Sequence, residues 1–281
     1  MTNALSITWN ADPIAFRLGS FGVHWYSLCW AAGLLAAYFV VQRLYKRQGL
    51  TEKQFEPLFF YCFFGILIGA RVGDCLFYHA DYYLTHPLEI IIPMRQTAEG
   101  WKFTGYEGLA SHGGTLGLMI ALWLYIRKTG VNLLRVLDNI AIATPITACC
   151  IRLGNFFNSE IVGLPTDLPW GVVFAHNGEA FARHPGQLYE AAAYLLLFFI
   201  GAALYRRRPD RVGTGWYFGL CLTYIFTFRF FIEFVKDIQV GFEQGMALNM
   251  GQLLSLPFIV LGTYCLAGGK LCQILGEKKR G

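Results

Sequence analysis

Residues 136–157 read VLDNIAIATPITACCIRLGNFF, an apolar run that carries one arginine, Arg152, near its carboxyl end. A helix needs about 20 predominantly apolar residues to cross a bilayer, so the run is long enough to span. An arginine at the centre of a bilayer costs about 2.5–3.5 kcal/mol. A spanning segment that keeps such a residue has a use for it.

Six further apolar runs have spanning length. Of the 281 residues, 55% are hydrophobic and only 15% are charged, and the mean hydropathy is +0.43. Soluble domains carry about 25% charged residues, so this composition indicates a membrane protein. We therefore expect an all-α polytopic membrane protein, with residues 1–281 forming a single transmembrane domain of seven helices. The other six predicted spans are 23–41, 57–78, 109–126, 187–205, 214–235 and 252–269.

Lysine and arginine are distributed unequally between the two sides of these spans. One set of alternate connections, 42–56, 127–135, 206–213 and 270–281, holds 15 of the 23 basic residues, the other set holds 5, and 3 lie within spans. The positive-inside rule then places the N-terminus outside and the C-terminus in the cytoplasm. Basic loops beside anionic lipid account for the net charge of +5, so no nucleic-acid partner is expected.

The three arginines within spans, Arg71, Arg152 and Arg229, all fall in the outer halves of their segments. Other polar residues share that half, and together they predict a polar chamber open toward the outer leaflet. These residues are Tyr26, His112, Asn155, Glu160, Glu190 and Glu233.

Helix-internal ion pairs are an alternative explanation for two of the arginines. Arg71 and Asp74 are separated by three residues, and Arg229 and Glu233 by four, so each pair can meet on one helix face. Arg152 has no acidic residue at either spacing and is the best candidate for binding an anion.

Two other classes of membrane protein also carry polar residues inside their spans. A transporter or channel places charges there, but in this chain they crowd into one half of the membrane. An intramembrane serine protease would need a buried serine facing a histidine, and no Gly-x-Ser-x-Gly sequence occurs. The eight cysteines show neither CxxC nor Cys/His ligand spacing, so we expect no disulfides and no metal site.

The stretch 151–163, IRLGNFFNSEIVG, resembles the signature of the bacterial prolipoprotein diacylglyceryl transferases at every fixed position. Gly69-Ala70-Arg71, Ser111-His112-Gly113-Gly114, residues 183–190 and residues 229–234 match further family motifs in order. The chain departs from the family at three positions, where it has Ser111, Ile225 and Lys236.

The resemblance implies an enzyme of the bacterial inner membrane with its active site toward the outer leaflet. Such an enzyme transfers the diacylglyceryl group of phosphatidylglycerol to the lipobox cysteine of a preprolipoprotein, forming a thioether and releasing glycerol phosphate. It needs no cofactor and no metal. Its partners are the lipid and the signal-peptide region of the protein substrate.

The resemblance also suggests roles for particular residues. Arg152 and Arg229 suit the phosphate, because a guanidinium can hold two of its oxygens. His112 is the candidate base for the thiol, oriented by Glu160 or Glu233, although the arginines alone could instead lower the pKa of the thiol. The predicted substrate-binding residues are Arg152, Tyr26, Arg71, Asn155, Asn158, Glu160, Gly163, His184, Gln187, Glu190 and Glu233.

Overall fold

The computed structural model describes residues 7–19, 21–92, 94–97, 100–103, 108, 110–237 and 246–277. The chain forms two compact units: the first comprises residues 1–44 and 134–281, and the second comprises residues 45–133. Each unit has its own set of packed helices.

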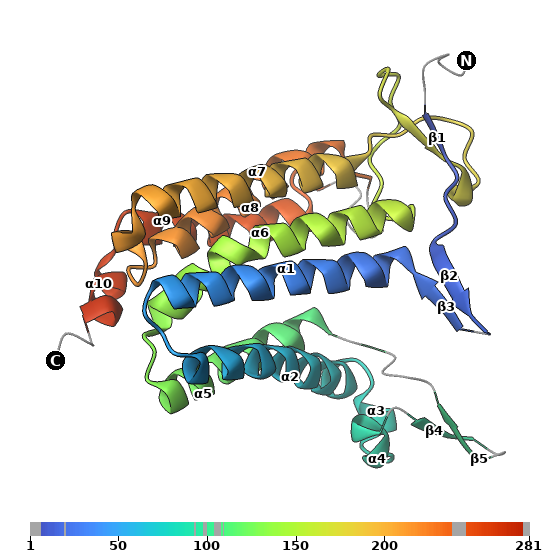
Figure 1. Ribbon diagram of the computed structural model, residues 1–281. Helices are drawn as coiled ribbons and strands as arrows, with labels where there is room; N and C mark the ends of the chain where they lie inside the picture. The colour runs from blue at the N-terminus through green and yellow to red at the C-terminus, as the bar shows by residue number, and fades with distance from the viewer. Residues whose placement is uncertain are drawn as a thin grey trace. The chain divides into compact units, whose positions relative to one another are not determined.

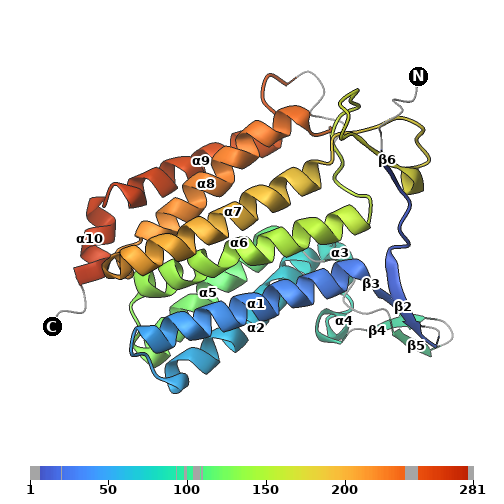
Figure 2. The same cartoon turned by 45° about the horizontal axis from the view of Figure 1, so that its top comes forward.

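The first unit is a layer of long helices. Figures 1 and 2 show these helices running alongside one another. A buried cluster that includes Leu44, Ile142, Tyr205 and Tyr217 packs one end of this layer. Within the described residues, the long helices are α1 (Trp25–Arg47), α6 (Leu133–Phe157), α7 (Gly186–Arg207), α8 (Trp216–Ile232) and α9 (Met250–Leu266).

Helix α8 is capped by a carboxylate from a neighbouring helix. Asp138 of α6 is fully buried and accepts hydrogen bonds from the backbone N–H groups of Gly213 (2.8 Å), Gly215 (2.9 Å) and Phe218 (2.9 Å). The first N–H groups of a helix have no acceptor within the helix. The carboxylate of Asp138 acts as that acceptor and so joins α6 to α8.

Asp138→Ala is expected to destabilise the protein by about 3 kcal/mol, because one buried and two partly buried N–H groups would each lose their acceptor. Unfolding of the purified protein in mixed micelles measures the change. The exposed Asp210→Ala is the matched control and should change stability little. Equal stability of the two variants would contradict the capping role.

Short elements join the long helices of the first unit. Strands β1 (Ile7–Trp9) and β6 (Val172–Phe174) pair in parallel, and β2 (Ile14–Leu18) pairs antiparallel with β3 (Phe21–His24). The prediction of an all-helical chain omitted these strands. The remaining elements are η1 (Ala175–Asn177), η2 (Pro209–Arg211), η3 (Glu233–Val235) and α10 (Lys270–Glu277).

The second unit is built on two helices, α2 (Glu52–Phe77) and α5 (Ser111–Thr129). Glycines let them approach closely: a Cβ added at Gly73 would lie 2.7 Å from the Cα of Gly113. A Cβ at Gly117 would lie 2.8 Å from the Cα of Gly69. Gly113 and Gly117 thus allow the two helix backbones to pack closely. Between the helices the chain forms α3 (Ala80–Tyr83), α4 (Leu88–Ile91) and the antiparallel pair β4 (Met94–Thr97) and β5 (Gly100–Phe103).

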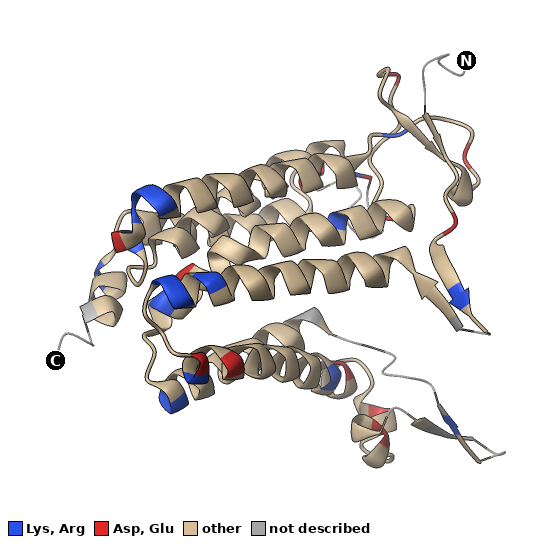
Figure 3. Ribbon diagram, viewed as in Figure 1, with Lys and Arg blue, Asp and Glu red and all other residues tan. Residues whose placement is uncertain are grey.

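Each of the seven predicted spans coincides with an observed helix, and the ends differ by a few residues. Within the described residues, five helices are long and apolar enough to cross a membrane: α1, α2, α6, α7 and α8 continued by η3. The number is six if α9 and α10, which meet at a bend of 60°, count as one span. Figure 3 shows how few charges lie along the middle of the long helices. The chain is therefore a multi-pass membrane protein by length and composition, while the seventh span and the orientation stay predictions.

Candidate active site

Most of the predicted site residues lie in the first unit. Arg152, Asn155, Glu190 and Arg229 come from the ends of α6, α7 and α8, which the fold brings together through direct contacts. Arg71 and His112 belong to the second unit, on α2 and α5.

Arg152 has a partner that sequence spacing could not reveal. Its Nε lies 3.1 Å from Oε2 of Glu190 on α7, and its Nη1 donates to Oδ1 of Asn155 at 3.3 Å. The expectation of an isolated arginine was therefore wrong, because it considered acids on the same helix alone. No hydrogen bond from Nη2 of Arg152 occurs within the described residues, so that side of the fork remains available to an anion.

Arg152 is one end of an ion-pair network that runs through Glu190, Lys236 and Glu233 to Arg229. The Nζ of Lys236 lies 3.2 Å from Oε2 of Glu190 and 3.3 Å from Oε1 of Glu233. The Nε of Arg229 lies 3.7 Å from the same Glu233 oxygen, which confirms the predicted i,i+4 pair. Glu190 and Lys236 are buried, whereas the side chain of Arg229 is partly exposed.

The ion-pair network contains three cations and two carboxylates, so it carries one positive charge in excess. Charges in a poorly hydrated site interact strongly and need compensation. An anion beside the two arginines would balance the network. Its composition therefore suits the binding of a phosphate or another singly charged anion.

Glu160 is held in a strained loop that follows α6. Its neighbours Ser159 and Ile161 have φ angles of 55° and 58°, in the left-handed region that a β-branched residue rarely adopts. Oε1 of Glu160 accepts hydrogen bonds from Asn155 (2.8 Å) and Asn158 (3.4 Å). Backbone strain of this kind is concentrated at functional sites, where the surrounding contacts maintain it.

Gln187 binds the same loop from α7. Its Nε2 donates to the backbone oxygen of Glu160, while its buried Oε1 has no donor within the described residues. The buried Oδ1 of Asn158 also has no donor within the described residues. Buried acceptors normally have partners, so these two oxygens are candidates for contact with a bound ligand or water.

Gly163 allows two stretches of backbone to pass close together. Its N–H donates to the carbonyl oxygen of His184 at 2.9 Å, and an added Cβ would lie 2.6 Å from the Cβ of His184. Tyr26 of α1 packs in a similar way on Gly154, where an added Cβ would lie 2.9 Å from the tyrosine ring. Both glycines of the motif thus have a steric function in the structure.

His184 is oriented by two aromatic residues. Trp170 donates from Nε1 to the hydroxyl of Tyr189 at 2.8 Å, and that hydroxyl lies 3.2 Å from Nδ1 of His184. Because the indole N–H acts only as a donor, the Tyr189 oxygen accepts a hydrogen bond from it. The hydroxyl of Tyr189 can still form a second hydrogen bond with Nδ1 of His184. The Tyr189 hydroxyl therefore holds the ring of His184 in place, whichever of the two groups donates.

Arg183 fixes the loop beside the site. It binds both carboxylate oxygens of Glu179 and also donates to the backbone oxygen of Gly163 (3.0 Å) and to Asp237 (2.8 Å). The hydrogen bonds from the guanidinium hold the pKa of Glu179 below its ordinary value, and the same pairing raises the pKa of Arg183.

The lowered pKa of Glu179 predicts an acid-sensitive contribution to stability. A carboxyl with a depressed pKa in the folded state stabilises the protein above its unfolded pKa, and the contribution is lost as pH falls through the folded pKa. Wild type and Glu179→Gln should therefore differ in thermal stability at pH 6 and converge as the pH falls below about 4. A difference that does not change with pH would contradict the ion pair.

The two predicted site residues of the second unit, Arg71 and His112, lie outside the ion-pair network. Arg71 is buried and donates to the backbone oxygens of Glu89 (2.7 Å) and Ile90 (3.3 Å), while Asp74 lies 3.3 Å from Nδ1 of His79. These contacts differ from the predicted pairing of Arg71 with Asp74. His112 is exposed in the first turn of α5.

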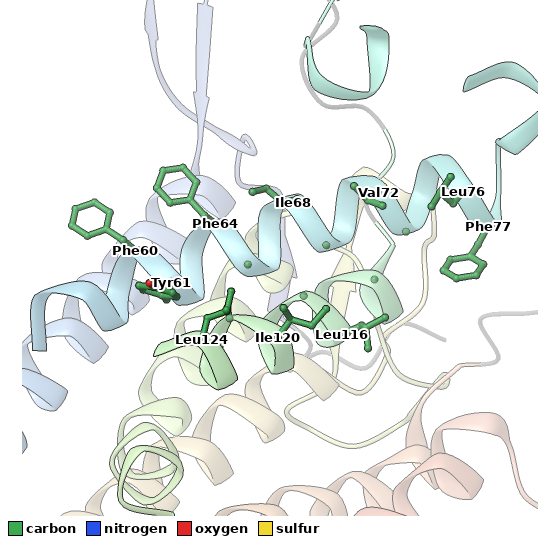
Figure 4. A pocket seen from close by; sticks show the side chains of 16 residues that line it. Phe60, Tyr61, Phe64, Ile68, Val72, Leu76, Phe77, Leu116, Ile120 and Leu124 are labelled. Carbon is green, nitrogen blue, oxygen red and sulfur yellow. The ribbon is translucent and has the colours of Figure 1, made fainter. Parts of the chain in front are cut away.

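An apolar groove of about 620 Å³ is lined by residues of both α2 and α5 (Figure 4). Phe60, Phe64, Leu116, Ile120 and Leu124 stand on its walls, and glycines from both helices contribute to its lining. Among the described residues that line it, none is charged. The groove is therefore predominantly apolar, with the hydroxyl of Tyr61 as a polar group in its lining, in contrast to the ion-pair network of the first unit.

Three further residues contact the predicted site, and of these the sequence had singled out Lys236 alone, as a departure from the family. Lys236 joins the two carboxylates of the ion-pair network, Tyr194 donates to Glu190 at 3.2 Å, and Asn249 donates to Glu233 at 3.1 Å. The spacing of Arg229, Glu233 and Lys236 on nearby turns was a usable signal for Lys236. Tyr194 stands one turn after Glu190, but Asn249 has no comparable signal.

The amino-acid sequence matches known proteins over most of its length. The family model of the prolipoprotein diacylglyceryl transferases matches residues 13–267. A Bacteroides fragilis protein is 58% identical over 261 residues, covering 92% of this chain and 94% of the relative. Proteins of Tolumonas auensis (44% over 255 residues; 90% and 94%) and Porphyromonas gingivalis (42% over 279 residues; 94% and 95%) are also similar. All three are named phosphatidylglycerol–prolipoprotein diacylglyceryl transferase. With its motif, its membrane helices and these relatives, the chain belongs to the prolipoprotein diacylglyceryl transferase family.

Proposed function

We propose that this protein transfers the diacylglyceryl group of phosphatidylglycerol to the lipobox cysteine of preprolipoproteins. The thiolate forms a bond to the glyceryl carbon, the bond from that carbon to the phosphate oxygen breaks, and glycerol phosphate leaves with the electron pair. The names of the relatives support this reaction. The structural observation that carries the proposal is the ion-pair network, whose excess positive charge and open arginine fork suit a phosphodiester.

Arg152 and Arg229 are the proposed catalytic cations. The phosphodiester carries one negative charge before the reaction, and the departing phosphate gains charge as the carbon–oxygen bond breaks. Donors that are already oriented toward the developing charge lower the barrier. Glu190 and Glu233 fix Nε of the two arginines, so the outer nitrogens can face the lipid.

The proposed binding wall consists of polar side chains that share contacts with this network or with the Glu160 loop. Asn155, Glu160 and Gln187 are joined by hydrogen bonds, and the ring of His184 is oriented by Tyr189. Arg71 is also proposed to contact substrate, although its guanidinium already binds two backbone oxygens. The remaining members of the proposed set are Tyr26, Asn158 and Gly163.

Incubation of the purified protein with phosphatidylglycerol and a lipobox peptide tests the reaction. Mass spectrometry should detect a diacylglyceryl addition to the peptide, and a peptide with serine in place of the cysteine should stay unmodified. Absence of product, together with uptake of a labelled solute by proteoliposomes, would favour a transporter instead.

His112 is proposed as the base that removes the thiol proton. If it is, His112→Gln should lose far more rate near pH 7 than near pH 9, where a thiol of pKa about 8.5 ionises unaided. The rate of peptide modification at the two pH values decides the question. An equal deficit at both would show that His112 positions substrate and does not remove the proton.

The proposed topology has seven spans, with the N-terminus outside and the active site toward the outer leaflet of the bacterial inner membrane. The lysine and arginine distribution supports this orientation. Reporter fusions after residues 130 and 213, expected in the cytoplasm, and after residue 178, expected outside, test it. A cytoplasmic signal from position 178 would reverse the orientation.

A further inference from the structure

The segment 78–92 of the second unit has its polarity inverted. Leu84, Leu88 and Ile91 are exposed to 71%, 62% and 74% of their surface, whereas Glu89 is exposed to only 3%. A water-facing loop normally shows the opposite pattern, with charged residues outside. Apolar residues on the outside and charged residues on the inside are what a lipid environment favours.

The polar groups on the inner side of this segment are paired with one another. Arg71 lies with its guanidinium carbon 4.8 Å from the ring centroid of Tyr83, and Glu89 accepts a hydrogen bond from the hydroxyl of Tyr82 at 2.8 Å. His86 stacks on the ring of Tyr82 at a centroid separation of 4.5 Å. Glu89 is thus paired within the unit, whereas Asp81 of the same segment is exposed.

Backbone polar groups in the segment are also satisfied internally. The N–H groups of Leu84, Glu89 and Ile92 donate to carbonyl oxygens three or four residues earlier. The last carbonyl oxygens of a helix have no N–H donor within the helix. At the end of α4, Arg71 donates to two of these oxygens, those of Glu89 and Ile90. Internal satisfaction of the backbone is the main requirement for a segment that contacts hydrocarbon.

The spanning helix α2 also exposes apolar residues. Phe77, the last residue of α2, and Tyr78, which follows it, are also largely exposed. Farther along α2, Ile68 and Phe64 are exposed as well. A tyrosine at the end of a spanning helix is typical of the boundary between hydrocarbon and headgroups.

We propose that residues 78–92 form an interfacial anchor, with α3 and α4 lying in the membrane at the carboxyl end of α2. Leu84, Leu88 and Ile91 contact the acyl chains, and Arg71 closes the end of α4. The partner is therefore a lipid surface. Short amphipathic segments bind membranes in this way, through apolar side chains inserted at the level of the headgroups. This proposal is independent of the transferase reaction.

Photolabelling of the full-length protein in lipid nanodiscs tests the anchor. A phosphatidylcholine with a diazirine on its acyl chain should label residues 84–92 at a yield comparable to that of α2. The exposed residues 176–178 of the first unit should stay unlabelled. Labelling of α2 without labelling of 84–92 would overturn the proposal, and so would labelling of 84–92 by a water-soluble diazirine instead.

A single charge should distinguish the apolar face from other exposed positions. Leu88→Asp is expected to lower acyl-chain labelling of the segment at least severalfold while leaving the labelling of α2 unchanged. His176→Asp introduces a negative charge at an exposed position of the first unit, outside the segment, and should have little effect. Equal labelling in the two variants would contradict the assigned face. The wild-type experiment stands even if Leu88→Asp fails to fold.

Discussion

Arg152→Lys should lower kcat/KM for lipobox-peptide modification by about a hundredfold or more. Nε and Nη1 of Arg152 are held by Glu190 and Asn155, which directs the other side of the planar fork toward a ligand. Lysine retains the charge but is a compact point donor that cannot hold a carboxylate and two phosphate oxygens at once. Arg152→Ala should be at least as impaired.

The control for this experiment is Arg206→Lys, at the opposite end of the first unit, where the arginine is exposed. Its activity should equal that of wild type. Both variants should be compared at equal amounts of folded protein, judged by gel filtration. Near-normal kcat/KM in Arg152→Ala would remove Arg152 from the phosphate site.

Glu190→Leu is expected to destabilise the protein by about 3–5 kcal/mol, because a buried ion pair that loses one partner leaves the other charge uncompensated. Two cations are affected, Arg152 and Lys236, and Tyr194 also loses its acceptor. A typical domain has only about 5–15 kcal/mol of stability in total. The midpoint of unfolding in mixed micelles should fall sharply.

A double-mutant cycle separates loss of charge balance from loss of packing. Lys236→Met alone leaves Glu190 and Glu233 close together with one cation fewer. The double variant Glu190→Leu, Lys236→Met removes one charge of each sign and should be less destabilised than the sum of the two single variants. Strict additivity would show that Glu190 and Lys236 do not interact, contrary to their separation of 3.2 Å.

The spanning helices could be predicted from the sequence because burial in lipid demands a long apolar run, and such runs are visible without knowledge of the fold. The predicted span 136–157 corresponds to α6, Leu133–Phe157. The strands could not be predicted in the same way. β1 and β6 have only three residues each, too few to show an alternation of apolar and polar residues. They also lie far apart in the sequence, so their pairing cannot be predicted from local pattern.

Partners of the charged residues were predictable within one helix and unpredictable between helices. The pair Arg229 and Glu233 follows from helical spacing. The pair Arg152 and Glu190 depends on how α6 and α7 are rotated about their axes, which periodicity does not determine. Arg71 instead binds the end of α4, because the chain after α2 folds back onto the same unit.

The glycines between α2 and α5 have a mechanical consequence. At the pairs Gly73–Gly113 and Gly69–Gly117, backbone meets backbone with no room for a methyl group. Sliding either helix by one residue would drive a neighbouring side chain into this space, since residues such as Ala70 and Leu116 stand next to the glycines. The register between the two helices is therefore locked. We therefore expect α2 and α5 to move together as one rigid body.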